Sequence, residues 1–92
     1  MPEVTLSEHS PEHADLTLDA TGLRCPLPLL KTRQALRQLA PGALLLVRAT
    51  DIGARRDIPA YLRQSGHELV RASETDGELR FLIRVADTTS AP

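Results

Sequence analysis

The residues with the clearest capacity for chemistry are Cys25, the only cysteine in the chain, and the prolines at positions 26 and 28. Proline lacks an N–H and has a fixed φ, so it suits the first position of a helix. The pattern therefore predicts Cys25 as a helix N-cap, at the positive end of the macrodipole and beside unpaired backbone N–H groups. That position favours the thiolate, which attacks electrophiles or holds transferred sulfur. A lone cysteine is also commonly a small buried residue, and position alone leaves both interpretations open.

The charges around Cys25 are unevenly distributed, although the net charge of the chain is only -1. Residues 1–19 contain acids but no Lys or Arg, whereas residues 20–50 contain Lys and Arg but no acid. Cations such as Arg24 would further favour the thiolate and would steer an acidic partner surface or an anionic sulfur compound to the site. A solvated, arginine-rich helix face explains the same pattern equally well.

The composition excludes several classes of function. One cysteine among 92 residues forms no intramolecular disulfide, no C-x-x-C redox pair and no multi-cysteine zinc site. His9 and His13 could share a metal, but Pro11 between them argues against a helix holding that spacing, so we predict no metal site. Aromatic residues make up only 2%, which argues against base-stacking platforms. The chain has no apolar run long enough for a membrane span and no signal-peptide pattern, so we expect a cytoplasmic protein without membrane insertion.

The first half of the chain reads as strand, helix, strand after a polar extension over residues 1–14. Alternating polar and apolar residues predict a strand over residues 15–19, followed by a turn at Gly22. An apolar stripe predicts a helix over residues 26–40, and a nearly continuous apolar run predicts an interior strand over residues 43–49. A strand–helix–strand unit of this length implies parallel strands with a right-handed crossover.

The second half reads as helix, strand, strand. Pro59 is expected in the first turn of the helix, with Asp57 as its cap or dipole partner. Strands are expected over residues 67–73 and 79–85, joined by a turn that contains Asp-Gly, and residues 87–92 are expected to be a tail. The order β-α-β-α-β-β predicts an α/β two-layer sandwich: a four-stranded mixed sheet with both helices on one face and a more polar opposite face.

The predicted parallel strands place the Cys25 loop and the following strand's loop at the same end of the sheet. Charged residues of that second loop could then lie near the thiol; they are Asp51, Arg55, Arg56 and Asp57. Capping and salt bridges explain these charges equally well. His67 should lie at the other end of the sheet, which makes it a poor general base for Cys25.

Residues 18–28 resemble the D-x-x-G-x-x-C-P-x-P signature of the TusA (SirA-like) sulfur-carrier family, and residues 51–59 resemble its second block. The resemblance covers about residues 15–86, and the family's fold is the same two-layer sandwich. It implies that Cys25 accepts sulfane sulfur as a persulfide and passes it on, without a metal or an organic cofactor. In this family Asp19, Gly22, Pro26 and Pro28 would shape the loop and the helix start, and Arg24 would help to hold the anions.

The expected function is therefore a sulfurtransferase-type carrier rather than a free-standing enzyme. Its partners would be a sulfur donor, such as a cysteine desulfurase or a rhodanese, and a sulfur-accepting protein in tRNA thiolation, cofactor biosynthesis or sulfur metabolism. Some members have Glu between the two prolines, where this chain offers the apolar Leu27 to a partner. Two alternatives are a regulatory or protein-interaction module with a structural or redox-sensing cysteine, and a nucleic-acid-binding domain. Near-neutral charge and few aromatics argue against direct nucleic-acid binding.

Overall fold

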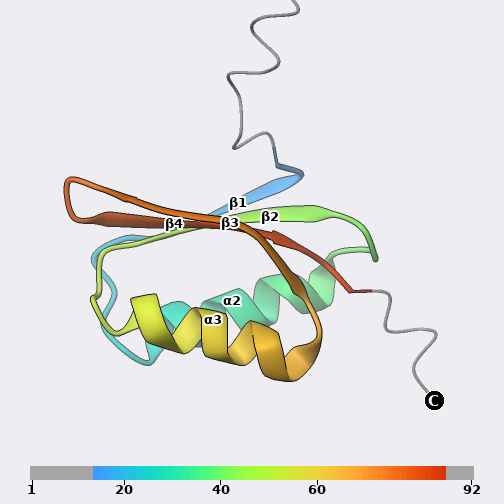
Figure 1. The fold of residues 1–92 in the computed structure, drawn as a ribbon, viewed down its shortest axis with the longest axis horizontal. Coiled ribbons are helices and arrows are strands. Elements are labelled where there is room, and N and C mark those ends of the chain that lie inside the picture. Colours follow the sequence, from blue (N-terminus) through green and yellow to red (C-terminus); the bar gives the residue numbers. More distant parts are fainter. Residues whose placement is uncertain (1–13, 87–92) are drawn as a thin grey trace, which may run out of the picture.

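The structure is a computed structural model that describes residues 14–86 (Figure 1). The predicted tail, nearly all of the predicted N-terminal extension, and His9 and His13 within that extension lie outside the described residues. Neither helix within residues 14–86 is long and apolar enough to cross a membrane.

The described residues form a four-stranded mixed sheet with both helices on one face (Figure 1). Strands β1 and β2 are parallel, β4 runs antiparallel to β2 and β3, and the strand order across the sheet is β1-β2-β4-β3. The predicted two-layer sandwich and its element order are thereby confirmed. The elements are β1 (Leu16–Ala20), α2 (Leu27–Gln38), β2 (Leu44–Ala49), α3 (Ala54–Ser65), β3 (Glu68–Thr75) and β4 (Glu78–Arg84).

The hydrophobic core lies between the sheet and the helices and is almost entirely aliphatic. Alternate residues of the two central strands face it, and the apolar sides of α2 and α3 cover it. Its fully buried larger side chains include Leu45, Val47, Ile58 and Ile83. Burial of such a side chain contributes about 1.5–3 kcal/mol each, so this layer holds both helices against the sheet.

The opposite face of the sheet is charged, as predicted, but it is not uniformly polar. Leu46 of β2 pairs with Leu82 of β4 there, and both side chains are buried. Arginines and glutamates surround this apolar pair, so the face combines a small hydrophobic centre with ion pairs.

The second helix begins earlier than the sequence pattern indicated. Helix α3 starts at Ala54, so Pro59 is its sixth residue and the prediction of Pro59 in the first turn is wrong. The start is set by the preceding loop: the Ala54 N–H donates to the Asp51 carbonyl at 3.0 Å, and the Asp57 N–H donates to the Gly53 carbonyl at 3.0 Å. Because proline lacks an N–H, it removes one hydrogen bond inside α3. Asp57 does lie in the first turn, where a carboxylate interacts favourably with the helix dipole.

Candidate functional site

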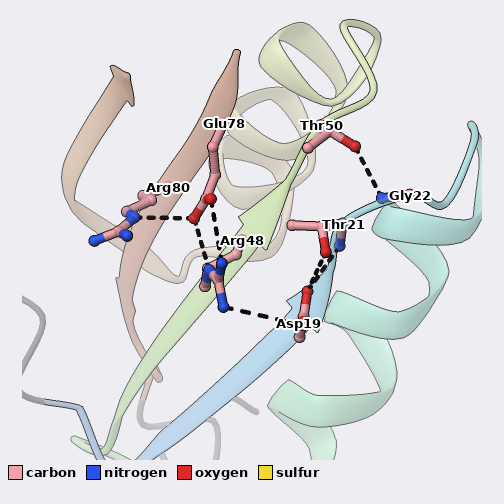
Figure 2. A network of polar contacts seen from close by, with 7 residues as sticks. All are labelled: Asp19, Thr21, Gly22, Arg48, Thr50, Glu78 and Arg80. Carbon is pink, nitrogen blue, oxygen red and sulfur yellow. Dashed lines mark hydrogen bonds and ion pairs between the residues drawn. The ribbon is translucent and has the colours of Figure 1, made fainter. Parts of the chain in front are cut away.

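Two loops at one end of the sheet build the site. Because β1 and β2 are parallel, the loop after each strand leaves from the same edge, as predicted. The Gly22 N–H donates a 2.8 Å hydrogen bond to Thr50 Oγ1, which joins the two loops directly (Figure 2). Gly22 has a φ of 81°, a conformation that glycine adopts at little cost. The turn between β1 and α2 is therefore fixed both by its own backbone and by the neighbouring loop.

Asp19 shapes the same turn from the last part of β1. Its Oδ1 accepts hydrogen bonds from the Thr21 N–H at 3.0 Å and the Thr21 hydroxyl at 2.6 Å (Figure 2). These two bonds, followed by the more distant charge of Arg48, lower the pKa of Asp19. The structure thus gives Asp19 a loop-forming position on the open side of the sheet, not a contact with Cys25.

Cys25 lies one residue before the position predicted for it. Helix α2 begins at Leu27 with Pro26 as its N-cap, so the prediction of Cys25 as the N-cap is wrong. The Leu27 N–H donates to the Arg24 carbonyl at 2.8 Å, which closes a turn over residues 24–27 before the helix starts. The peptide bond between Cys25 and Pro26 is cis. Pro28, the second helical residue, is buried and occupies a position whose N–H would have no helical partner.

The thiol of Cys25 is exposed and contacts a residue of the second helix. Its Sγ donates a hydrogen bond to Asp57 Oδ2 at 3.4 Å. The cleft beside it is too narrow to admit a water molecule, and its lining is mostly apolar apart from two carboxylates. The lining residues are Cys25, Pro26, Pro28, Leu29, Asp51, Ala54 and Asp57.

This environment raises the pKa of the Cys25 thiol. The hydrogen bond to Asp57 is the largest cause, followed by partial loss of hydration beside the cleft and by the negative charges of Asp57 and Asp51. Each of these favours the neutral thiol over the thiolate. The structure therefore corrects the prediction of a thiolate stabilised by the helix terminus and by neighbouring cations, because the nearest charges are acidic.

Of the four charged residues predicted near Cys25, the two acids line the cleft and the two arginines do not. Asp51 and Asp57 line the cleft, whereas Arg55 forms a 2.6 Å ion pair with Glu74 of β3. Arg56 is exposed and makes no ion pair with any of the residues 14–86.

Arg24 precedes the thiol in sequence, but it is exposed, and its guanidinium has no hydrogen-bonding or ionic partner within the described part of the chain. The structure therefore brings the two acids, and none of the three arginines, into the cleft.

Two further residues matter at the site and were not predicted. Thr50 joins the loops, and Gly53 allows them to approach each other. A Cβ at Gly53 would lie 2.9 Å from Asp51 Oδ2 and 3.6 Å from the Cys25 Cβ. The Gly53 N–H also donates to Asp51 Oδ2 at 3.0 Å, which fixes that carboxylate in the cleft. The Asp-x-Gly spacing was the available signal, because Asp side chains commonly bond to the backbone two residues later.

An ion-pair network on the open sheet face supports the end of β1. Glu78 accepts from Arg48 Nε at 2.6 Å and from Arg80 Nε at 3.1 Å, and Arg48 also lies 3.9 Å from Asp19 (Figure 2). The bonds from Arg48 and Arg80 lower the pKa of Glu78 to about 2. The network connects β4 through β2 to the strand that leads into the Cys25 loop.

The described residues contain no group of three or more side chains that could hold a metal ion. What they do contain is a two-layer α/β domain with one exposed thiol at a helix start. That arrangement can perform thiol exchange with a sulfur atom presented from solvent or by another protein.

Comparison with known proteins places this arrangement in a family. The sequence profile of Sulfurtransferase TusA matches residues 16–85, which include both loops of the site. The chain is 50% identical over 70 residues to the sulfur carrier protein TusA of Pseudomonas aeruginosa, covering 76% of this chain and 89% of the relative. It is 43% identical over 70 residues to the TusA protein of Allochromatium vinosum, covering 76% and 92%. The chain therefore belongs to the TusA family, and the resemblance seen in its motifs is confirmed.

A solved structure supports the fold independently. The SirA-like protein of Desulfitobacterium hafniense superimposes with a TM-score of 0.69, covering 78% of this chain and 99% of that protein. The two sequences are 24% identical, so this likeness concerns the fold alone.

Proposed function

We propose that this chain carries sulfane sulfur as a persulfide on Cys25 and relays it to a partner protein. The observation that carries the proposal is the placement of the only cysteine. It is exposed in one of the two loops that the hydrogen bond between Gly22 and Thr50 joins, inside the region that matches the TusA family. Two members of that family, 43% and 50% identical to this chain over the aligned residues, are named sulfur carrier proteins.

The transfer requires no oxidant. The Cys25 sulfur attacks the outer sulfur of a donor cysteine persulfide and forms a new S–S bond, while the bond between the two donor sulfurs breaks. The donor cysteine leaves as a thiolate and takes up the proton that Cys25 releases. In the second exchange an acceptor thiol attacks the outer sulfur on Cys25, and Cys25 returns to the thiol. Sulfur is only passed on, so no metal or organic cofactor has a part in either step.

The surroundings of Cys25 suit a protein partner better than a small substrate. The cleft does not enclose a ligand, because even a water molecule does not fit. The segments beside it instead expose large apolar side chains: Ile52 is 71% exposed and Leu27 is 43% exposed. Scattered apolar residues around a reactive atom fit a small, transient interface, as a carrier that serves two partners needs. The chain would then act as a sulfurtransferase-type carrier and not as a free-standing enzyme.

The donor we expect is a protein that itself forms a cysteine persulfide, such as a cysteine desulfurase or a rhodanese. The acceptor would belong to tRNA thiolation, cofactor biosynthesis or sulfur metabolism in the cytoplasm, and the relay needs neither direct nucleic-acid contact nor membrane insertion. Leu27 between the two prolines gives this chain an apolar contact where some members of the family have Glu. We therefore expect its partner choice to depend on that side chain.

The hydrogen bond between Cys25 and Asp57 favours a second candidate function. A thiol held in this way could be structural or redox-sensing, in a module that acts through protein contacts. The two functions differ in what Cys25→Ser does. A carrier loses sulfur transfer and keeps its fold, whereas a structural cysteine leaves a destabilised protein.

The deciding experiment is intact-mass measurement of the reduced full chain after incubation with a cysteine desulfurase and cysteine, or with polysulfide. We expect one added sulfur that is removed by reductant and is absent from Cys25→Ser. Absence of added sulfur from either donor, in a protein whose circular dichroism is unchanged, would contradict the carrier function.

A further inference from the structure

Asp57 makes a contact with Cys25 that only the empty form of a sulfur carrier can make. The Cys25 Sγ donates its proton to Asp57 Oδ2 across 3.4 Å. Once a second sulfur is attached, Sγ is bonded to carbon and to sulfur and has no proton left to donate. The hydrogen bond therefore depends on the loading state of the thiol and not only on the fold.

The geometry of the cleft also excludes the added sulfur from the position of this bond. An S–S bond is about 2.05 Å long, so a sulfur placed on the line from Sγ to Asp57 would overlap the carboxylate oxygen. The cleft has no space for a water molecule, and a sulfur atom is larger. A persulfide on Cys25 must therefore point its outer sulfur away from Asp57 and out of the cleft.

The charges that face Cys25 act in the same direction. Asp57 of α3 and Asp51 of the loop before α3 both line the cleft. The Asp51 carboxylate accepts a 3.0 Å hydrogen bond from the Gly53 N–H, which holds it in place. The residues that α2 and its N-cap contribute to the cleft are uncharged, and Arg24 in the preceding loop is exposed without an ionic partner in residues 14–86. Two carboxylates repel a persulfide anion and favour a neutral thiol, in keeping with the raised pKa of Cys25.

We propose that Asp57, assisted by Asp51, is a positioning residue that holds the empty carrier as a hydrogen-bonded thiol and turns the sulfur outward when the carrier is loaded. This inference rests on the proposed carrier function and adds a distinction between its two states. The empty form keeps its thiol neutral and slow to react with small electrophiles. The loaded form presents an outward sulfur, and a donor or acceptor protein that supplies a cation at the cleft would compensate for the two carboxylates.

The test begins with the empty, reduced full chain and does not need a sulfur donor. The rate of alkylation of Cys25 by iodoacetamide, a neutral reagent, is measured across pH for the wild type, Asp57→Asn and Asp51→Asn. For each unit by which the thiol pKa falls, the thiolate fraction at neutral pH rises about tenfold. The intrinsic nucleophilicity of the thiolate falls about threefold at the same time, so the alkylation rate rises about threefold per unit. We expect the pH profile to move to lower pH in both variants, and further in Asp57→Asn.

The matched control is Glu68→Gln, which also removes one negative charge. Glu68 begins β3 at the opposite end of the sheet and pairs with Arg84 at 3.1 Å. Its profile should coincide with that of the wild type, which separates a local effect from one of net charge. A profile for Asp57→Asn that coincides with the wild type would overturn the proposal. If Asp57→Asn does not fold, the same comparison with Asp51→Asn decides.

A second measurement separates this proposal from the carrier function itself. Polysulfide is equilibrated with the wild type and with Asp57→Asn, and the loaded fraction of each is read by intact mass. We expect a higher loaded fraction in Asp57→Asn, because the persulfide anion no longer faces that carboxylate. Loading of the wild type with an equal fraction in the variant would overturn the proposed role of Asp57 and leave the carrier function standing. Failure of the wild type to load would reject the carrier function, whatever the alkylation profiles give.

Discussion

The two ends of the helical layer differ in shape and charge. At one end lies Cys25, beside a narrow cleft with two carboxylates and no space for a water molecule. At the other end, where α2 and α3 finish, lies a cleft of about 250 Å³. Its lining includes the cationic side chains of Arg33 and Arg37 together with the rings of Tyr61 and His67. The guanidinium of Arg33 stacks 5.6 Å from the centre of the Tyr61 ring.

The comparison shows that the more spacious cleft and the reactive thiol lie at different ends of the molecule. A spacious, well-formed pocket is the usual first hypothesis for a site, but the cleft of about 250 Å³ is not lined by the thiol, whereas the narrow one is. A small-molecule enzyme needs a cavity because it must surround its substrate. A carrier has the opposite requirement, since its sulfur atom must reach into the sites of other proteins. The exposed thiol beside a nearly closed cleft fits the second case.

The first prediction separates the two ends by sulfur loading. Cys25→Ser should abolish loading by polysulfide, while Arg37→Gln should load to the same extent as the wild type, because a small donor needs no contact with the basic cleft. Intact mass measures both. Loss of loading in Arg37→Gln, with its fold preserved, would mean that the two ends act together and that the contrast is wrong.

The second prediction compares two glycines in the same backbone conformation at opposite ends. Gly22 and Gly42 have φ values of 81° and 88°, and neither has an atom within 4 Å of an added Cβ. Alanine at either position should therefore lower the free energy of unfolding by about 1–2 kcal/mol through backbone strain alone. Urea denaturation measures this cost.

Only Gly22→Ala should also change the alkylation rate of Cys25, because its strain falls on the turn whose N–H joins the Cys25 loop to Thr50. Gly42→Ala serves as the control of equal strain. A changed alkylation rate in both variants would point to global loosening and would remove the argument that the joined loops position the thiol.

Much of the fold could be predicted from local pattern. Alternation and apolar runs identified the strands, and a strand–helix–strand unit dictates parallel pairing, which in turn brought the Cys25 loop beside Asp51 and Asp57. The start of α3 differs from the prediction, because Pro59 lies inside the helix and does not mark its boundary. The structure places that boundary at the turn formed by Asp51 and Gly53, whose backbone bonds precede Pro59 by a full turn.

The electrostatics of the site were not accessible from sequence. The basic stretch after Cys25 predicts a cationic site, but Arg33 and Arg37 lie further along α2 and line clefts that do not include the thiol. The thiol instead bonds to a residue 32 positions away in the chain. A pKa depends on contacts through space, so charge patterning along the chain predicts the wrong direction for the pKa shift of Cys25.

The third prediction concerns the ion pairs that support β1 at the Cys25 end. The pKa of Glu78 is about 2 in the folded protein and 4.5 ordinarily, so the unfolded chain binds its proton more tightly. The stabilisation from Glu78 is complete above about pH 4.5 and is lost as the pH falls toward about 2. Glu78→Gln should therefore be less stable than the wild type at neutral pH, with a difference that shrinks over this range.

Urea midpoints of the wild type and Glu78→Gln across that pH range test the prediction. Arg84→Gln, which disrupts a pair with Glu68 at the other end, is the control and should not reproduce the same pH dependence. A constant difference between Glu78→Gln and the wild type from neutral to acidic pH would contradict it.

The smallest effect is expected at the opposite end, from His67. Burial lowers the pKa of His67 below its ordinary value of 6.5, and its Nδ1 accepts a 2.9 Å hydrogen bond from the Ala86 N–H. Protonation would place a second donor against that N–H, so the folded state binds the proton less well than the unfolded chain. Stability should therefore fall slightly as the pH drops below about 6.5, and this component should be missing from His67→Gln. Identical pH dependence in both proteins would show that His67 does not titrate differently on folding. A change in Cys25 alkylation in His67→Gln would show that the two ends are coupled, because the imidazole and the thiol share no contact.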